Sequence, residues 1–166
     1  GKRHADIEGI YLPDDNILFN SIVNNGRNVV ECPLTYDGES YGVDFEKLER
    51  VIADPQTTML IFCNPHNPVG RVWTREELER VAEICLKYNV IWMVDEMHCD
   101  FIFPGHTFTS CMNLDEKYRE ILALYSSPGK TFNVAGLSRR ISLFQMKNYG
   151  RNTSGRIHRQ LTAREV

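Results

Sequence analysis

Short apolar segments alternate with amphipathic segments over most of the chain. The apolar segments are rich in β-branched or aromatic residues, a pattern that is typical of strands. The four predicted strands cover residues 28–31, 58–63, 90–94 and, with a weaker signal, 121–125. Helical spacing occurs between them, at residues 45–53 and at residues 74–88. The last three strands are apolar at consecutive positions, so we expect both of their faces to be buried.

The predicted helix at residues 74–88 has the clearest local signals. It opens with a capping box, in which Thr74 and Glu77 can satisfy each other's backbone amides. Its apolar residues follow the spacing of one helix face, and they are Leu78, Val81, Ala82 and Cys85. Strands that alternate with helices in this way predict an α/β fold, with a mostly parallel sheet and flanking helices.

Composition adds that the chain is an ordinary globular domain. Of its 166 residues, 42% are hydrophobic and 25% are charged, which excludes the disordered and fibrous classes. No apolar run approaches the roughly 20 residues that a membrane span needs, so we expect no membrane partner and place the chain in the cytoplasm. Its five cysteines are an odd number without CxxC spacing, so we expect buried thiols, with neither a disulfide framework nor a metal site.

Polar segments rich in glycine and proline follow three of the predicted strands. In a parallel sheet, ligands bind at the carboxyl ends of the strands, so the chemistry is expected there. The first segment is NPHNPVGR at residues 64–71, the second is DEMHCD at residues 95–100, and the third is SSPGKTFNVAGL at residues 126–137.

Each segment taken alone has an ordinary structural explanation. Two Asn-Pro steps and a glycine in residues 64–71 are turn chemistry. Asp95 directly follows a buried strand and needs a cationic partner there, unless it is a helix cap or a surface acid. Lys130 follows two serines and a glycine that could cradle a phosphate, although the spacing differs from the Walker pattern. A solvated surface lysine is the alternative.

Together and in this order, the three segments resemble the active site of fold-type-I enzymes that depend on pyridoxal 5′-phosphate (PLP). The resemblance is to the aminotransferase class I and II family, and within it to the cystathionine β-lyase-like carbon–sulfur lyases. It runs from about Asn16 to Leu137 and includes the stretch at residues 19–27. It implies that residues 1–137 are part of the PLP-binding large domain, with residues 1–15 divergent.

The resemblance implies a role for each candidate site residue. Lys130 would form a Schiff base with the cofactor aldehyde, and Asp95 would pair with the pyridine nitrogen, so that the ring acts as an electron sink. Asn67 would hydrogen-bond the phenolic oxygen of PLP, with His98 near the same oxygen.

The phosphate of PLP would be held by Ser127, with Ser126 beside it. The implied reaction is an α,β-elimination, in which Lys130 takes the Cα proton of a sulfur amino acid and the products are a thiol, pyruvate and ammonia. A transamination would use the same residues, so an aminotransferase is the alternative. In this family the complete protein is expected to be a homodimer.

The sequence departs from the family pattern near both ends. Where the family has Pro-Val-Tyr, with the tyrosine ring stacked on PLP, this chain has Pro13-Asp14-Asp15, whose charges should weaken PLP binding. Residues 1–12 match no family segment, and a frayed terminus is one explanation for them. The N-terminal glycine loop is missing, and so is the small domain with its substrate-binding arginine. We therefore expect a truncated, inactive fragment, and a non-catalytic remnant that acts by self-association is the alternative from another class.

Residues 138–166 differ in charge from the rest, since they hold seven of the 19 Lys and Arg but one of the 22 Asp and Glu. A nucleic-acid-binding arm is one explanation, but clustered arginine without a recognisable module is a weak signal, and we expect no nucleic-acid partner. We hypothesise instead that residues 139–166 are an out-of-frame reading of the family's own continuation. Read from the third base of each codon, residues 145–150 permit the Asn-Glu-Lys-Leu-Arg pattern of the family. This tail would then have no selected fold.

Overall fold

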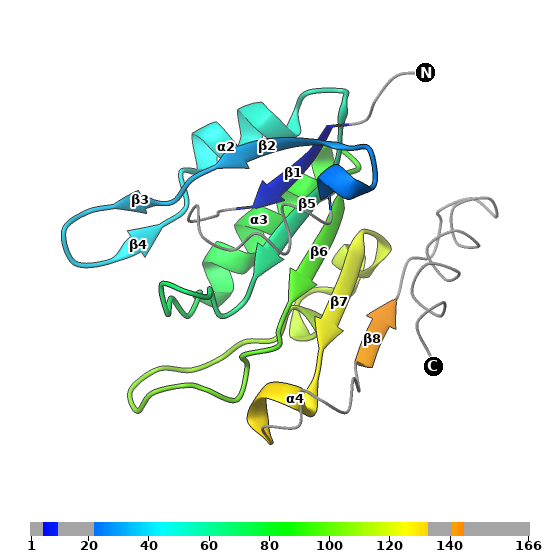
Figure 1. Ribbon diagram of the computed structural model, residues 1–166. Helices are drawn as coiled ribbons and strands as arrows, with labels where there is room; N and C mark the ends of the chain where they lie inside the picture. The colour runs from blue at the N-terminus through cyan, green and yellow to red at the C-terminus, as the bar shows by residue number, and fades with distance from the viewer. Residues whose placement is uncertain (1–4, 10–21, 133–140, 145–166) are drawn as a thin grey trace.

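The computed structural model describes residues 5–9, 22–132 and 141–144, and a six-stranded sheet forms its centre (Figure 1). The strands are β1 (Ala5–Gly9), β2 (Asn28–Cys32), β5 (Thr57–Cys63), β6 (Ile91–Asp95), β7 (Leu122–Ser126) and β8 (Ile141–Phe144). They lie in the order β2-β1-β5-β6-β7-β8. Neighbouring strands are parallel except for β7 and β8, which are antiparallel. The prediction of an α/β fold with a mostly parallel sheet is therefore confirmed.

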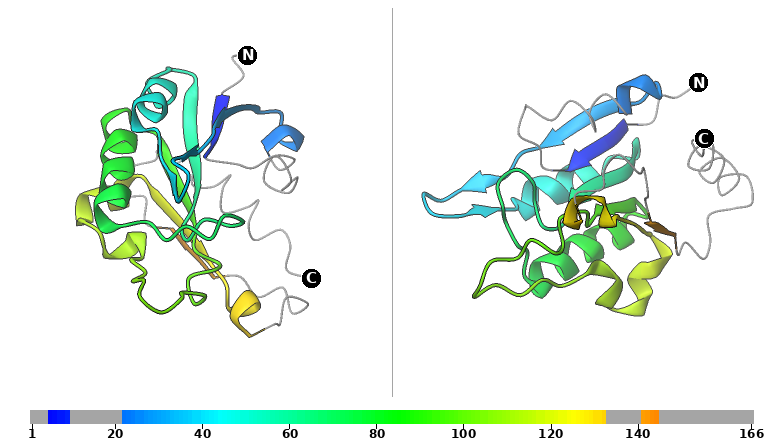
Figure 2. Two further views of the ribbon diagram at one scale, coloured as in Figure 1. Left: turned by 90° about the vertical axis from the view of Figure 1, so that its left-hand side faces the viewer. Right: turned by 60° about the horizontal axis from the view of Figure 1, so that its bottom comes forward.

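Two helices, α2 (Phe45–Ile52) and α3 (Arg75–Lys87), cover one side of the sheet (Figure 2). The side chain of Asp44 caps α2, and Thr74 and Glu77 form the complete capping box at the start of α3. These side-chain oxygens accept hydrogen bonds from backbone N–H groups that have no partner in the first turn of a helix. Both helices therefore begin where the sequence predicts.

The two faces of the sheet differ in burial. On the face toward the helices, Leu60, Trp92 and Leu122 are fully buried and belong to one cluster with the apolar side of α3. On the opposite face, Ile61, Ile91 and Ala123 are buried as well, whereas Met59 and Met93 are half-buried. The expectation that the central strands are buried on both faces is therefore confirmed at the first three positions and wrong at the two methionines.

Strand β1 shows that residues 5–9 are not a frayed terminus. It lies between β2 and β5 and pairs with both of them in parallel. The sequence Ala-Asp-Ile-Glu-Gly is a weak strand signal by itself. The strand forms because it pairs with two neighbours that are distant along the chain. Pro13, Asp14 and Asp15 lie outside the described residues.

Strand β8 lies within the segment that was expected to be a basic tail. It pairs with β7, so that Leu143 is opposite Leu124 and Ile141 is opposite Ser126. The rest of the expected tail, residues 138–140 and 145–166, lies outside the described residues. The out-of-frame hypothesis rests on residues 145–150, which therefore also lie outside the described residues.

Shorter elements connect the strands and helices. They are β3 (Thr35–Tyr36), β4 (Tyr41–Gly42), η1 (Cys111–Asn113), η2 (Glu116–Glu120) and α4 (Pro128–Thr131). The antiparallel pair β3 and β4 extends beyond the end of the sheet (Figure 1). In the part of the chain that the structure describes, no helix is long and apolar enough to cross a membrane, and no cluster of residues could hold a metal ion.

The cysteines are all free thiols, but they differ in burial. Cys32, Cys85 and Cys111 are buried, as expected, whereas Cys63 and Cys99 are only half-buried. Burial raises the pKa of the Cys85 and Cys111 thiols above the usual value, which keeps them protonated and unreactive.

Candidate active site

The carboxyl ends of β5, β6 and β7 lie level at one edge of the sheet. Cys63 at the end of β5 is in register with Asp95 at the end of β6, and Asp95 is in register with Tyr125 of β7. Beyond the strands, the backbone N–H of Asn64 donates to the carbonyl of Asp95 at 2.9 Å. The N–H of Glu96 donates to the carbonyl of Tyr125 at 2.8 Å. The three segments that were predicted to carry the chemistry therefore leave the same edge of the sheet (Figure 1).

The loop after β5 folds back on itself and leaves Asn67 exposed. The N–H of His66 donates to the carbonyl of Arg71 at 2.8 Å, and the N–H of Gly70 donates to the carbonyl of His66 at 2.8 Å. Gly70 has φ of +71°, where a side chain would be strained, so this turn requires glycine. The ring of His66 is buried against Trp73, with centroids 6.2 Å apart. The start of the loop is thus buried, while Asn67 is accessible to a ligand.

Asp95 and His98 lie at the start of the segment after β6. Asp95 is half-buried, and its Oδ1 accepts a hydrogen bond from the N–H of Met97 at 2.9 Å. The half-buried ring of His98 lies 6.1 Å from the ring of Phe101, between centroids. The N–H of Phe101 donates to the carbonyl of His98 at 3.0 Å. Local contacts therefore hold both candidate side chains at the sheet edge.

The third segment, after β7, carries two serines and the lysine. Ser126 is half-buried at the last position of the strand, and Ser127 is 8% exposed. Lys130 is exposed and lies in α4. Beside it, the hydroxyl of Thr131 donates to Oδ2 of Asp100 at 2.5 Å. This hydrogen bond ties α4 to the segment after β6.

A pocket of about 170 Å³ opens between the first two segments. Its lining includes Asn67 and His98, together with His106, Phe101 and Phe103. The other four predicted site residues are not part of this lining. The structure therefore brings all six residues to one edge of the sheet and places two of them on a pocket.

The functional groups at this edge fit PLP by their chemistry. The amine of Lys130 can react with an aldehyde, and the carboxylate of Asp95 can pair with a protonated pyridine nitrogen. The Asn67 amide and an N–H group of the His98 ring can each donate a hydrogen bond to a phenolic oxygen. The two serine hydroxyls can donate to a phosphate. Each polar group of the cofactor therefore has a complementary side chain here.

Sequence analysis did not single out Glu96, which is 3% exposed. Its carboxylate accepts hydrogen bonds from Asn64, Ser110 and the backbone of Cys111. Burial raises the pKa of Glu96 above the usual value and outweighs the opposing effect of these donors. A signal was present in the sequence, because successive side chains of an extended chain point to opposite faces. Of the neighbours Asp95 and Glu96, one therefore faces the interior.

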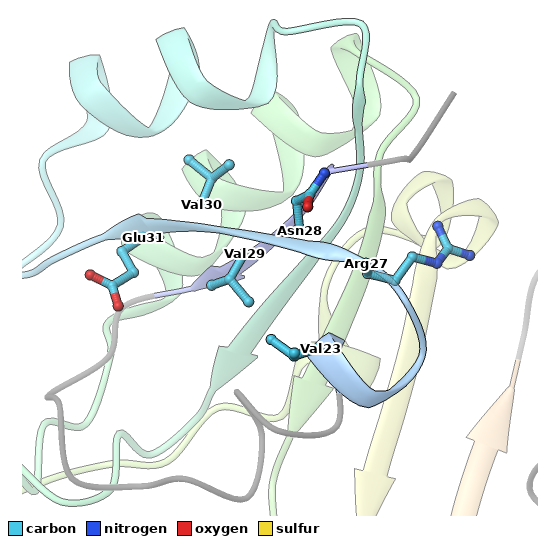
Figure 3. Close-up of a pocket in the computed structure, with 6 residues that line it drawn as sticks. All are labelled: Val23, Arg27, Asn28, Val29, Val30 and Glu31. Carbon is cyan, nitrogen blue, oxygen red and sulfur yellow. The ribbon is translucent and has the colours of Figure 1, made fainter. Parts of the chain in front are cut away.

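A second hollow, of about 560 Å³, lies along β2 (Figure 3). Its lining consists of Val23, Arg27, Asn28, Val29, Val30 and Glu31. Figure 3 shows the side chains of Arg27 and Glu31 pointing toward opposite ends of the hollow. The charged groups of this lining do not converge on one point, and none of the six predicted site residues contributes to it.

Residues 19–144, through the end of β8, match the family described as aminotransferase class I and II. The cystathionine beta-lyase PatB of Bacillus subtilis is 39% identical over 128 residues, which cover 77% of this chain and 32% of that protein. The probable kynurenine–oxoglutarate transaminase BNA3 of Saccharomyces cerevisiae is 35% identical over 99 residues, which cover 60% of this chain and 22% of that protein.

Among solved structures, cystalysin from Treponema denticola, which contains PLP, matches with a TM-score of 0.80 and 34% sequence identity. The match covers 88% of this chain and 37% of that chain, so this chain spans about a third of the length of the lyases that it resembles. Because the family model matches residues 19–144 and the PatB relative is 39% identical over 77% of this chain, the chain belongs to the aminotransferase class I and II family.

Proposed function

We propose that this chain supplies part of the cofactor-binding domain of a PLP-dependent carbon–sulfur β-lyase. The reaction would convert a sulfur amino acid into a thiol, pyruvate and ammonia. The observation that carries the proposal is the location of Asp95 and Lys130 after neighbouring parallel strands, at one edge of the sheet. A cystathionine beta-lyase and a PLP-containing cystalysin among the relatives support it.

Bound PLP supplies an electron sink that stabilises negative charge at the substrate Cα. Lys130 provides an exposed primary amine, which would hold the cofactor through its aldehyde and would take the proton from the substrate Cα. The carboxylate of Asp95 would keep the pyridine nitrogen protonated. Lys130 would therefore carry the proton transfer, and Asp95 would strengthen the electron sink.

The other four site residues bind and orient the cofactor. Asn67 and His98 lie on the same pocket and donate to the phenolic oxygen, which sets the orientation of the ring. Ser126 and Ser127 donate their hydroxyls to the phosphate from the end of β7. Ser127 is the more buried of the two serines, so its position is the better defined.

An aminotransferase is the alternative within the family, and the transaminase relative favours it. The same six residues would act, but Lys130 would return the proton to the cofactor rather than leave the electron pair to expel a thiol. Only the products distinguish the two reactions. A protein that contains this chain together with the remainder of the enzyme releases pyruvate and ammonia from cystathionine if it is a lyase. With a 2-oxo acid added as amino acceptor, it converts cystathionine into the corresponding oxo acid and the acceptor into an amino acid, without free ammonia, if it is an aminotransferase.

Cofactor binding is tested on the chain itself by titration with PLP. We expect weak binding and little turnover, with a visible absorbance band that is absent in Lys130→Ala. Lys117→Ala is the matched control, since Lys117 lies on the helix side and pairs with Glu83 at 2.6 Å. A band that survives in Lys130→Ala would contradict the role of Lys130. The absence of any band would favour a non-catalytic remnant, and light scattering would show whether the chain self-associates.

A further inference from the structure

Glu96 is the most buried carboxylate among the described residues, with 3% of its surface exposed. It directly follows Asp95, yet it is absent from the lining of the pocket that contains Asn67 and His98. A buried charge is costly unless several hydrogen-bond donors meet it. The donors around Glu96 therefore indicate what this side chain does.

Donors from two separate segments meet the carboxylate, and the thiol of Cys111 also contacts it. The N–H of Cys111 donates to Oε1 at 2.8 Å, and Nδ2 of Asn64 donates to the same oxygen at 3.2 Å. The hydroxyl of Ser110 donates to Oε2 at 2.8 Å. Nδ2 of Asn64 also donates to the carbonyl of Thr109 at 2.9 Å. The side chains of Glu96 and Asn64 thus join the ends of β6 and β5 to residues 109–111.

Each joined segment carries part of the candidate site. Asn64 begins the loop that contains Asn67, and Glu96 lies between Asp95 and His98. The backbone of Glu96 also donates to Tyr125, next to the segment with the two serines and Lys130. The carboxylate of Glu96 therefore connects the starting points of the first two segments, and its backbone N–H contacts the strand that leads into the third.

We infer that Glu96 is a positioning residue, which holds the loops bearing Asn67, Asp95 and His98 in the arrangement that binds PLP. The inference has two parts. The effect of Glu96 on the loops concerns the protein alone and can be measured without the cofactor. The effect of Glu96 on PLP binding rests on the proposed function.

The first measurement is hydrogen exchange of the full chain without PLP, followed by mass spectrometry. In Glu96→Ala, the Cys111 amide loses its acceptor and Asn64 loses one partner. We expect peptides covering residues 64–67, 96–100 and 109–112 to exchange roughly tenfold faster, because the opening of these loops costs less free energy. Glu83→Ala is the matched control, since Glu83 accepts from Lys117 and Tyr118 away from this edge. It should leave the three peptides unchanged.

Glu96→Gln should restore wild-type exchange. Its amide oxygen can occupy the position of Oε1 and accept from Cys111 and Asn64, while its NH₂ group donates to the hydroxyl of Ser110. If Glu96→Ala does not fold, Ser110→Ala keeps the question open to measurement, because it removes a single donor to Oε2. We expect it to raise exchange at residues 109–112 first.

The second measurement is the PLP affinity of variants that circular dichroism shows to be folded. Glu96→Ala should weaken PLP binding by about tenfold or more, the scale on which supporting residues behind a binding site act. Glu96→Gln and Glu83→Ala should bind as the wild type does. A role in stability alone would leave the affinity of the folded protein unchanged.

The outcomes separate the two claims. Unchanged exchange at all three peptides in a folded Glu96→Ala protein overturns the inference, and so does unchanged PLP affinity in a chain whose wild type binds PLP. If the wild type and Lys130→Ala both show no PLP band, the proposed function fails, while the exchange data still decide whether Glu96 holds the loops.

Discussion

The helix-covered face of the sheet and its carboxyl edge are stabilised in different ways. On the face, Leu60, Leu78 and Trp92 are 0% exposed, and their burial stabilises the fold without any directional requirement. At the edge, the buried side chains are polar, and they are Asn64, His66, Glu96 and Ser127. Buried polar groups require hydrogen bonds in defined directions. The apolar face therefore decides whether the chain folds, and the polar edge decides where its functional groups lie.

The largest expected effect separates function from folding. Lys130→Ala should abolish the visible band of bound PLP completely, because no other group in the site supplies the reacting amine. Its free energy of unfolding should change by less than about 0.5 kcal/mol, since the side chain is exposed. Absorbance with PLP and urea unfolding without PLP measure the two quantities. A large loss of stability would show that the edge and the face are coupled.

The opposite result is expected for the apolar face. Trp92→Ala should destabilise the fold by about 3–5 kcal/mol, because it leaves a large cavity beside Phe62, whose ring lies 6.1 Å away. Trp92→Phe is the control. Within the described part of the chain, Nε1 of Trp92 makes no hydrogen bond, so Phe loses only volume and should cost clearly less. Urea unfolding curves check both, and equal costs would show that the indole N–H has a partner.

A pH comparison distinguishes the buried acid of the edge from an exposed acid. Burial raises the pKa of Glu96 in the folded state, so the folded protein takes up a proton at higher pH than the unfolded chain does. As the pH falls from neutral toward the ordinary glutamate value of about 4.3, the wild type should therefore gain stability relative to Glu96→Gln.

Glu83 provides the reference of opposite sign. Hydrogen bonds from Lys117 and Tyr118 lower the pKa of Glu83, so its stabilising effect is present above the unfolded value and is lost as the pH falls through the folded value. The wild type should thus lose stability relative to Glu83→Gln over the acidic range. Urea unfolding at a series of pH values measures both differences. Two differences of the same sign would rule out the assigned environment of Glu96.

The smallest effect concerns the start of α3, far from the edge. Thr74→Ala removes the hydroxyl that accepts from the N–H of Glu77 at 3.2 Å and should cost about 1 kcal/mol. Thr74→Ser keeps the hydroxyl and should cost much less. Neither variant should change PLP binding, so an altered absorbance titration for Thr74→Ala would mean that α3 and the edge are coupled.

Local signals in the sequence determined the central elements. The capping box and the apolar spacing of Leu78 to Cys85 predicted α3, and the apolar runs predicted β5, β6 and β7, because each pattern reflects the geometry of a single element. The parallel topology followed from the alternation of strands and helices. It was enough to predict that Asn67, Asp95 and Lys130 lie at one edge of the sheet.

Contacts between distant residues decided the rest. Ala5–Gly9 becomes a strand because β2 and β5 pair with it on both sides. The partners of Glu96 are Asn64, Ser110 and Cys111, which come from two other segments of the chain. A sequence pattern records what one residue prefers, whereas the partners of a buried polar group depend on where other segments pass, and only the folded chain brings those segments together.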